Sequence, residues 1–182
     1  DNYIINVTGA DFNHLGVETG GEYAIVGSYK SIFRNNVIVG WKIIATGAGI
    51  SVIDDSIVEN NTIGISLKGR GITAAGSNVI IRNNTVVTEL GSGIYEKDEG
   101  SGLLIDGNNI TSVSGVGILI EQLSNKRMPK NVTIINNVIN TGNKVAIDAK
   151  GVQEDTSYID LDSNVVFKKE IITPAGKVDT SK

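Results

Sequence analysis

The chain has 182 residues, a net charge of −4, 40% hydrophobic residues, 22 glycines, 2 prolines and no cysteine. This length suits one domain, and the lack of cysteine excludes disulfides and thiolate metal sites. The negative charge argues against nucleic acid as the main partner, and no apolar stretch is long enough to insert into a bilayer.

An asparagine followed two positions later by an aliphatic residue recurs about every 25 residues along the chain. A fixed period of this length indicates stacked structural units. Counted from each asparagine, positions −5, −3 and +2 are mostly apolar, which is the alternation of a strand with one buried face. The repeated asparagines are Asn13, Asn36, Asn61, Asn84, Asn108, Asn137 and Asn164.

A second column with the same period lies further along each unit, where a small residue precedes isoleucine. Its members are Ala24-Ile25, Gly49-Ile50, Gly71-Ile72, Gly93-Ile94, Gly117-Ile118 and Ala146-Ile147. In the third unit, Gly64-Ile65 competes with Gly71-Ile72 for this position. Each unit therefore consists of a strand, an asparagine bend, a second strand and a Gly-Ile strand, with variable loops between them.

Three short strands per unit without an intervening helix predict an all-β fold, a right-handed single-stranded parallel β-helix. We expect about seven coils of about 25 residues and three short parallel sheets, because each coil serves as the crossover between parallel neighbours. The helix is expected to span residues 1–170, with an irregular tail at 171–182. Asparagine suits the bend because it tolerates left-handed backbone conformations and its amide can bond along a stack.

The N-N-x-[IV] bends, as in Asn35-Asn36-Val37-Ile38 and Asn83-Asn84-Thr85-Val86, and the Gly-Ile strands resemble the right-handed parallel β-helix proteins of the pectin-lyase-like superfamily. The resemblance covers roughly residues 5–168. It implies a substrate groove along the sheet that follows the longest loops, which here is the Gly-Ile strand with its flanking segments.

Because isoleucine points inward on that strand, its successor points outward. Three adjacent coils then form one polar strip, on which a sugar can stack on an aromatic ring and bond to charged groups. A carboxylate pair could also support glycoside hydrolysis, and a lysine or tyrosine could act in β-elimination. The catalytic candidates are Glu121, Asp148 and Lys97, and the substrate-binding candidates are Tyr95, Lys150, Lys126 and Arg127.

Other motifs are weaker. Asp54-Asp55 lacks the partners of the pectinase-type aspartate pairs, and His14 is the sole histidine. Asp160-x-Asp162-x-Asn164 begins like a calcium loop but lacks the later glycine and glutamate. No motif indicates a cofactor or a metal site.

Two functions remain open. The first is an extracellular or virion-surface module that binds or processes a polysaccharide. The alternative is a structural or adhesive stalk in which the polar strip is an ordinary solvated sheet face. Homotrimer formation and attachment to a larger chain are compatible with either function.

Overall fold

The computed structural model describes residues 3–5, 23–43, 47–97, 100–122, 128–143, 145–167, 170–174, 176 and 178–180. These residues form short β-strands and one three-residue 3-10 turn, η1 (Glu154–Thr156), with no α-helix among them. The predicted all-β class is confirmed. Within the same part of the chain, no helix has the length and apolar character needed to cross a membrane.

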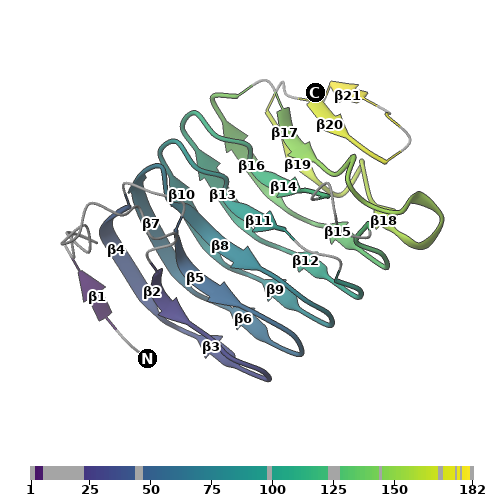
Figure 1. The fold of residues 1–182 in the computed structure, drawn as a ribbon. Helices are drawn as coiled ribbons and strands as arrows, with labels where there is room; N and C mark the ends of the chain where they lie inside the picture. Colours follow the sequence, from purple (N-terminus) through teal and green to yellow (C-terminus); the bar gives the residue numbers. More distant parts are fainter. Residues whose placement is uncertain are drawn as a thin grey trace, which may run out of the picture.

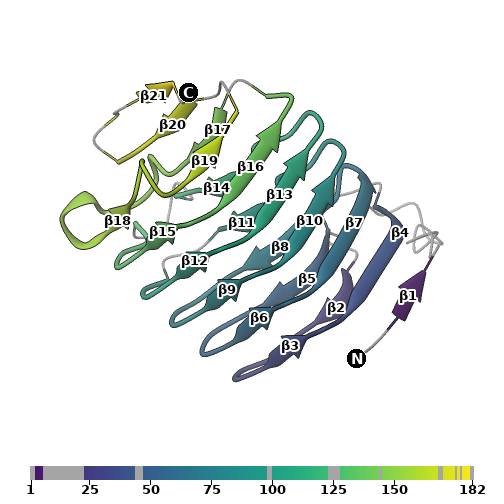
Figure 2. The same cartoon turned by 180° about the vertical axis from the view of Figure 1, so that it is seen from behind.

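The strands build three sheets that run side by side along one axis (Figures 1 and 2). The first sheet contains β1 (Tyr3–Ile5), β4 (Val37–Ile43), β7 (Thr62–Leu67), β10 (Thr85–Thr88), β13 (Asn109–Ser112), β16 (Val138–Thr141) and β19 (Val165–Val166). The second contains β2 (Tyr23–Val26), β5 (Ala48–Val52), β8 (Arg70–Ala74), β11 (Ile94–Glu96), β14 (Ile118–Ile120), β17 (Val145–Asp148), β20 (Glu170–Ile172) and β21 (Val178–Thr180). The third contains β3 (Ile32–Arg34), β6 (Ile57–Glu59), β9 (Ile80–Arg82), β12 (Leu104–Asp106), β15 (Thr133–Ile135) and β18 (Tyr158–Ile159).

Among the described residues, every pair of neighbouring strands is parallel except β20 with β21, and the chain visits the three sheets in turn as a right-handed solenoid. Five turns, from β3–β4–β5 to β15–β16–β17, have a strand of at least three residues in every sheet. A shorter sixth turn follows through β18, β19 and β20. The expected number of about seven full coils is slightly too high, because the last asparagine marks a turn with shorter strands and Asn13 lies outside the described residues.

The core lies inside the coil and consists mainly of isoleucine and valine. The Gly-Ile column is in register, since Ile50, Ile72, Ile94 and Ile118 are direct neighbours across the second sheet and are fully buried. This register resolves the ambiguity in the third unit in favour of Gly71-Ile72. Glycine precedes isoleucine in the middle coils because a Cβ at Gly93 would lie 2.4 Å from the Ile110 side chain.

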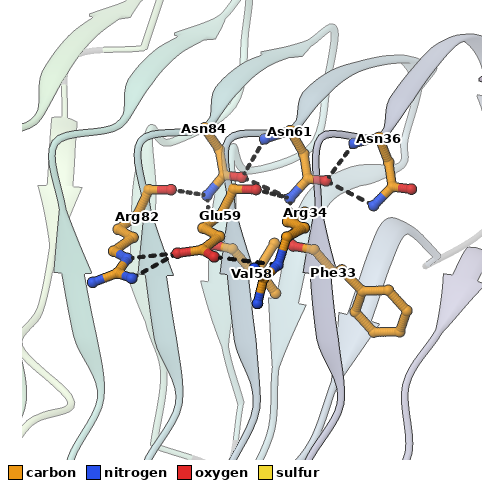
Figure 3. Close-up of polar contacts among 8 residues, drawn as sticks. All are labelled: Phe33, Arg34, Asn36, Val58, Glu59, Asn61, Arg82 and Asn84. Carbon is orange, nitrogen blue, oxygen red and sulfur yellow. Dashed lines mark hydrogen bonds and ion pairs between the residues drawn. The ribbon is translucent and has the colours of Figure 1, made fainter. Parts of the chain in front are cut away.

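The repeated asparagines form a buried ladder from Asn36 to Asn164, as predicted, with each side chain at most 3% exposed. In each rung Nδ2 donates to Oδ1 of the next asparagine at 2.9–3.0 Å, and the backbone N–H donates to the same oxygen at 2.9–3.1 Å. Figure 3 shows Asn36, Asn61 and Asn84 arranged in this way. The ladder amides also donate to backbone carbonyls, so that Asn84 Nδ2 reaches Val58 O at 2.9 Å and Arg82 O at 3.0 Å.

From Asn36 to Asn137, the left-handed turn is made by the residue before each ladder asparagine, which corrects the role expected for the ladder residue itself. Positive φ angles of 54–65° occur at Asn35, Asn60, Asn83, Gly107 and Asn136, among others. The ladder residues are absent from this set. The two roles are separated because the ladder side chain must point into the coil, while the exposed residue before it turns the chain. A second left-handed column, at Lys30, Asp55, Asn78, Gly102 and Asn131, turns the chain at the other end of the third sheet.

Both ends depart from the sequence repeat. Asn13 lies outside the described residues, and the position beside Ile38 in the first sheet is taken by Ile4 of β1. In the last turn, Ile159 rather than Leu161 pairs with Ile134, because the bend before Asn164 is two residues longer. The segment expected to be an irregular tail contains part of β20 and all of β21, which pair antiparallel, and Ile171 belongs to the core.

Candidate functional site

The predicted strip lies on the outer face of the second sheet. Thr73, Tyr95, Leu119 and Asp148 are successive neighbours across β8, β11, β14 and β17, in the register expected from the Gly-Ile column. Lys97, Glu121 and Lys150 follow two residues after Tyr95, Leu119 and Asp148. The structure therefore brings five of the predicted residues onto three adjacent turns.

Tyr95 is held between two charged side chains from neighbouring turns. The Cζ of Arg70 lies 3.7 Å from the centre of the tyrosine ring, and the hydroxyl donates to Oε2 of Glu121 at 2.5 Å. As a result Tyr95 is only 4% exposed, although it lies on an outward column. The Arg70 guanidinium therefore covers a face of the ring on which a sugar was expected to stack.

Asp148 and Lys150 form the second part of the strip. The Lys150 ammonium donates to Oδ2 of Asp148 at 2.9 Å, and the Lys150 backbone N–H donates to Oδ1 at 3.3 Å. The aspartate side chain is 11% exposed, whereas the lysine side chain is 68% exposed. The pair therefore presents a positive charge outward and keeps its carboxylate close to the sheet.

Three candidates remain. Lys97 is half-buried directly after β11. Lys126 and Arg127 lie outside the described residues. The site geometry thus rests on Arg70, Tyr95, Glu121 and the Asp148–Lys150 pair.

Two charged residues of this region were missed by the sequence analysis. Arg70 begins β8 and was not among the candidates, because only the register of the second sheet brings it onto Tyr95. Glu96 follows Tyr95 and is 1% exposed, between Ala74 and Ile120 on the neighbouring strands. Strand alternation from Ile94 predicts an inward side chain at this position, which was the available signal for a buried carboxylate.

The weaker motifs have structural roles. Asp54 Oδ1 accepts the backbone N–H of Ser77 at 2.7 Å, and Asp55 makes a left-handed turn. Asp160 Oδ1 accepts the backbone N–H groups of Asp162 at 3.0 Å and Ser163 at 3.2 Å. These two donors lower the pKa of Asp160 below its ordinary value. Its charge in turn raises the pKa of Tyr158.

No group of three or more metal-binding side chains occurs in the ranges that the structure describes. His14 lies outside the described residues. A shallow pocket at the C-terminal end is lined by Glu154, Ser157, Tyr158, Ile159, Leu161, Thr173 and Pro174, on other strands than the candidate site.

A family model described as a right-handed β-helix region matches residues 23–177. The chain belongs to this right-handed β-helix family. The fold-level resemblance to pectin-lyase-like β-helices is thereby confirmed. The searches of curated proteins and of solved structures return no match.

In this right-handed β-helix, the strip offers fixed hydrogen-bonding groups. The Glu121 and Asp148 carboxylates each have accepting capacity left after their observed bonds, since an ionised carboxylate has about four lone-pair sites. Lys150 and Arg70 supply donors on the same face. Such a set can bond to hydroxyl groups and to an anionic group of a bound molecule.

Proposed function

We propose that the chain is an extracellular or surface-exposed β-helix module that binds a polysaccharide along the outer face of its second sheet. The observation that carries this proposal is the interlocked Arg70–Tyr95–Glu121 cluster beside the Asp148–Lys150 pair. All five side chains project from successive turns of one rigid sheet. Their partners restrict their rotamers, so less conformational entropy is lost when a ligand binds.

The spacing of the strip suits an extended ligand. Equivalent residues on successive strands are about 4.8 Å apart, so the strip repeats polar groups along the solenoid axis. A glycan lying parallel to this axis would meet new donors and acceptors at each turn. Glu121 and Asp148 would accept hydroxyl protons, and Lys150 would donate to hydroxyl or uronate oxygens.

The contacts of the two carboxylates favour binding over catalysis. Hydrolysis needs one carboxylic acid that protonates the leaving group and a second carboxylate as base or nucleophile. Glu121 accepts the tyrosine hydroxyl, and Asp148 accepts the adjacent ammonium. Each carboxylate is therefore already engaged with a neighbouring side chain of the strip, which suits fixed binding groups better than a free catalytic pair. We therefore propose a module that retains its glycan.

A glycan array with neutral and acidic polysaccharides, combined with titrations of the retained ligands, tests this proposal. Glu121→Ala and Lys150→Ala should each weaken binding at least about tenfold, because each removes a charge-assisted bond. Tyr29→Ala is the matched control, since Tyr29 is 59% exposed and lies near the other end of the solenoid. Equal losses in all three variants, or no binding by the native chain to any polysaccharide, would refute the site.

A structural stalk is the second candidate function, and the uninterrupted asparagine ladder favours it. Five successive buried amide bonds run along the axis from Asn36 to Asn164. A continuous internal chain of this kind makes the solenoid stiff. Reducing-sugar and unsaturated-uronate assays that stay silent, together with an empty glycan array, would leave this function as the better account.

A further inference from the structure

The outer face of the third sheet carries an apolar column that the candidate function does not use. Ile32, Ile57, Ile80 and Leu104 are direct neighbours across β3, β6, β9 and β12, and all four side chains point outward. Ile32 is 51% exposed and the other three are partly exposed. Aliphatic side chains at successive outward positions form a stripe rather than isolated surface residues.

A column of charges with alternating sign runs beside this stripe. Arg34, Glu59, Arg82 and Asp106 occupy the next outward position on the same four strands. Figure 3 shows Glu59 between the two arginines, with Arg82 Nη2 at 2.7 Å from Oε2 and Arg34 Nε at 3.5 Å from Oε1. Glu59 thereby holds both guanidinium groups in place, while the arginine side chains remain 56% and 46% exposed.

The order of these charges has a particular symmetry. From the N-terminal to the C-terminal end, the charges of the column are positive, negative, positive and negative. In the reverse direction they are negative, positive, negative and positive, so each position then has the opposite sign. Two copies that face each other with antiparallel axes would place Arg34 opposite Asp106 and Glu59 opposite Arg82, twice each. Face-to-face pairing in parallel register would instead oppose like charges wherever the same columns meet.

We propose that this face is a self-association surface on which a second copy of the chain docks antiparallel, about a twofold axis that runs along the strand direction. That axis is the one that brings stripe onto stripe and charge column onto charge column. Ile32 then packs near the partner's Leu104, and Ile57 near the partner's Ile80. The pairing is isologous, so it closes at a dimer.

The contact is small, which sets the expected strength. Four strands at a spacing of about 4.8 Å give a patch about 19 Å long. With a width of roughly 12 Å, each copy contributes about 230 Å², below the range of stable interfaces. We therefore expect a weak dimer, with a Kd on the order of 100 µM or more, that weakens as salt screens the charge pairs.

Sedimentation velocity from about 10 to 500 µM chain at low ionic strength tests the proposal. Arg34→Glu alone and Asp106→Arg alone should each lower association at least about tenfold, because each variant opposes like charges twice in its homodimer. An equimolar mixture of the two variants should regain association, since the mixed dimer restores both outer pairs. Arg34 and Asp106 are three strands apart in one copy, about 14 Å, so contacts within one chain cannot produce this rescue.

Lys68→Glu is the matched control for Arg34→Glu, because it makes the same charge change at an exposed position outside the third sheet. It should leave association unchanged. Circular dichroism and melting curves of all variants establish that each is folded before it is compared. A chain that stays monomeric at 500 µM and low salt, a trimer, or a variant mixture that associates no better than the separate variants would overturn the proposal. Because no glycan is present, its failure would leave the polysaccharide proposal untouched.

Discussion

Replacing Asn84 by alanine tests the ladder at its centre. The substitution removes three hydrogen bonds that the side chain donates, to Asn108 Oδ1, Val58 O and Arg82 O. It also removes the oxygen that accepts the backbone N–H and Nδ2 of Asn61. Five bonds are therefore lost at a position that is 1% exposed.

The cost follows from the groups left without their partner. Arg82 O still accepts the backbone N–H of Asn60 at 3.2 Å, and Asn61 Nδ2 still donates to Phe33 O and Glu59 O. Val58 lies within β6, which keeps its backbone ladder with β9, so the Asn61 N–H is the group left without the partner described here. At about 1–3 kcal/mol for a buried polar group left unsatisfied, Asn84→Ala should destabilise the fold by about 1–3 kcal/mol. That is a substantial share of a typical total of about 5–15 kcal/mol.

Equilibrium urea unfolding followed by circular dichroism measures this loss. Asn83→Gly is the matched control, because Asn83 is exposed with φ 54° and the equivalent position one turn later is Gly107. Glycine adopts this conformation without strain, so the control should stay within about 1 kcal/mol of the native chain. A loss below about 1 kcal/mol for Asn84→Ala would refute the structural role of the ladder.

Three further predictions follow from other contacts. Gly93→Ala should lower the free energy of unfolding by about 1–3 kcal/mol through overpacking in the core. Gly64→Ala should leave it unchanged, because the added Cβ would lie 3.7 Å from its nearest neighbour. Thermal melts distinguish the two variants. An NMR titration should give Asp160 a pKa below the usual 3.8, so the stability it adds is present above pH 3.8 and is lost as the pH falls through its lowered pKa. Tyr158→Phe should raise that pKa toward 3.8, because the hydroxyl bond to Asp160 contributes to the lowering. Tyr95→Phe should cost about 1–3 kcal/mol through the lost bond to a carboxylate, and an unchanged melting temperature would contradict the observed contact.

The middle of the fold could be predicted from sequence because two independent requirements share one period. The ladder needs an asparagine at each bend, and the core needs an aliphatic residue two positions later. From Asn36 to Asn137 both requirements are met in every turn. The ends could not be predicted in the same way. At the N-terminal end, Ile4 pairs with Ile38, whereas the repeat predicted the unit of Asn13 at that position. At the C-terminal end, the longer bend after Ile159 breaks the spacing of the repeat.

The candidate site was predictable in its position but not in its contacts. Strand alternation placed Tyr95 on the outer face, and the register confirmed its neighbours. Its burial depends on the side chain of Arg70, which comes from the previous turn and has no local relation to Tyr95 in sequence. The positions of the left-handed residues could have been predicted from the repeated Asn-Asn pairs. Gly107, at the equivalent position of one unit, indicates that the first residue of each pair makes the turn.

The asparagine ladder has a direction. Each internal rung sends both its amide and its backbone N–H toward the C-terminal neighbour, while its oxygen receives the two donors of the rung before. Asn164 is the last rung, and its N–H and Nδ2 both turn to the carbonyl of Asp160, which the longer bend supplies. A coil duplicated between two internal rungs would therefore find complementary ends on both sides. A coil appended after Asn164 would first have to displace this built-in terminator.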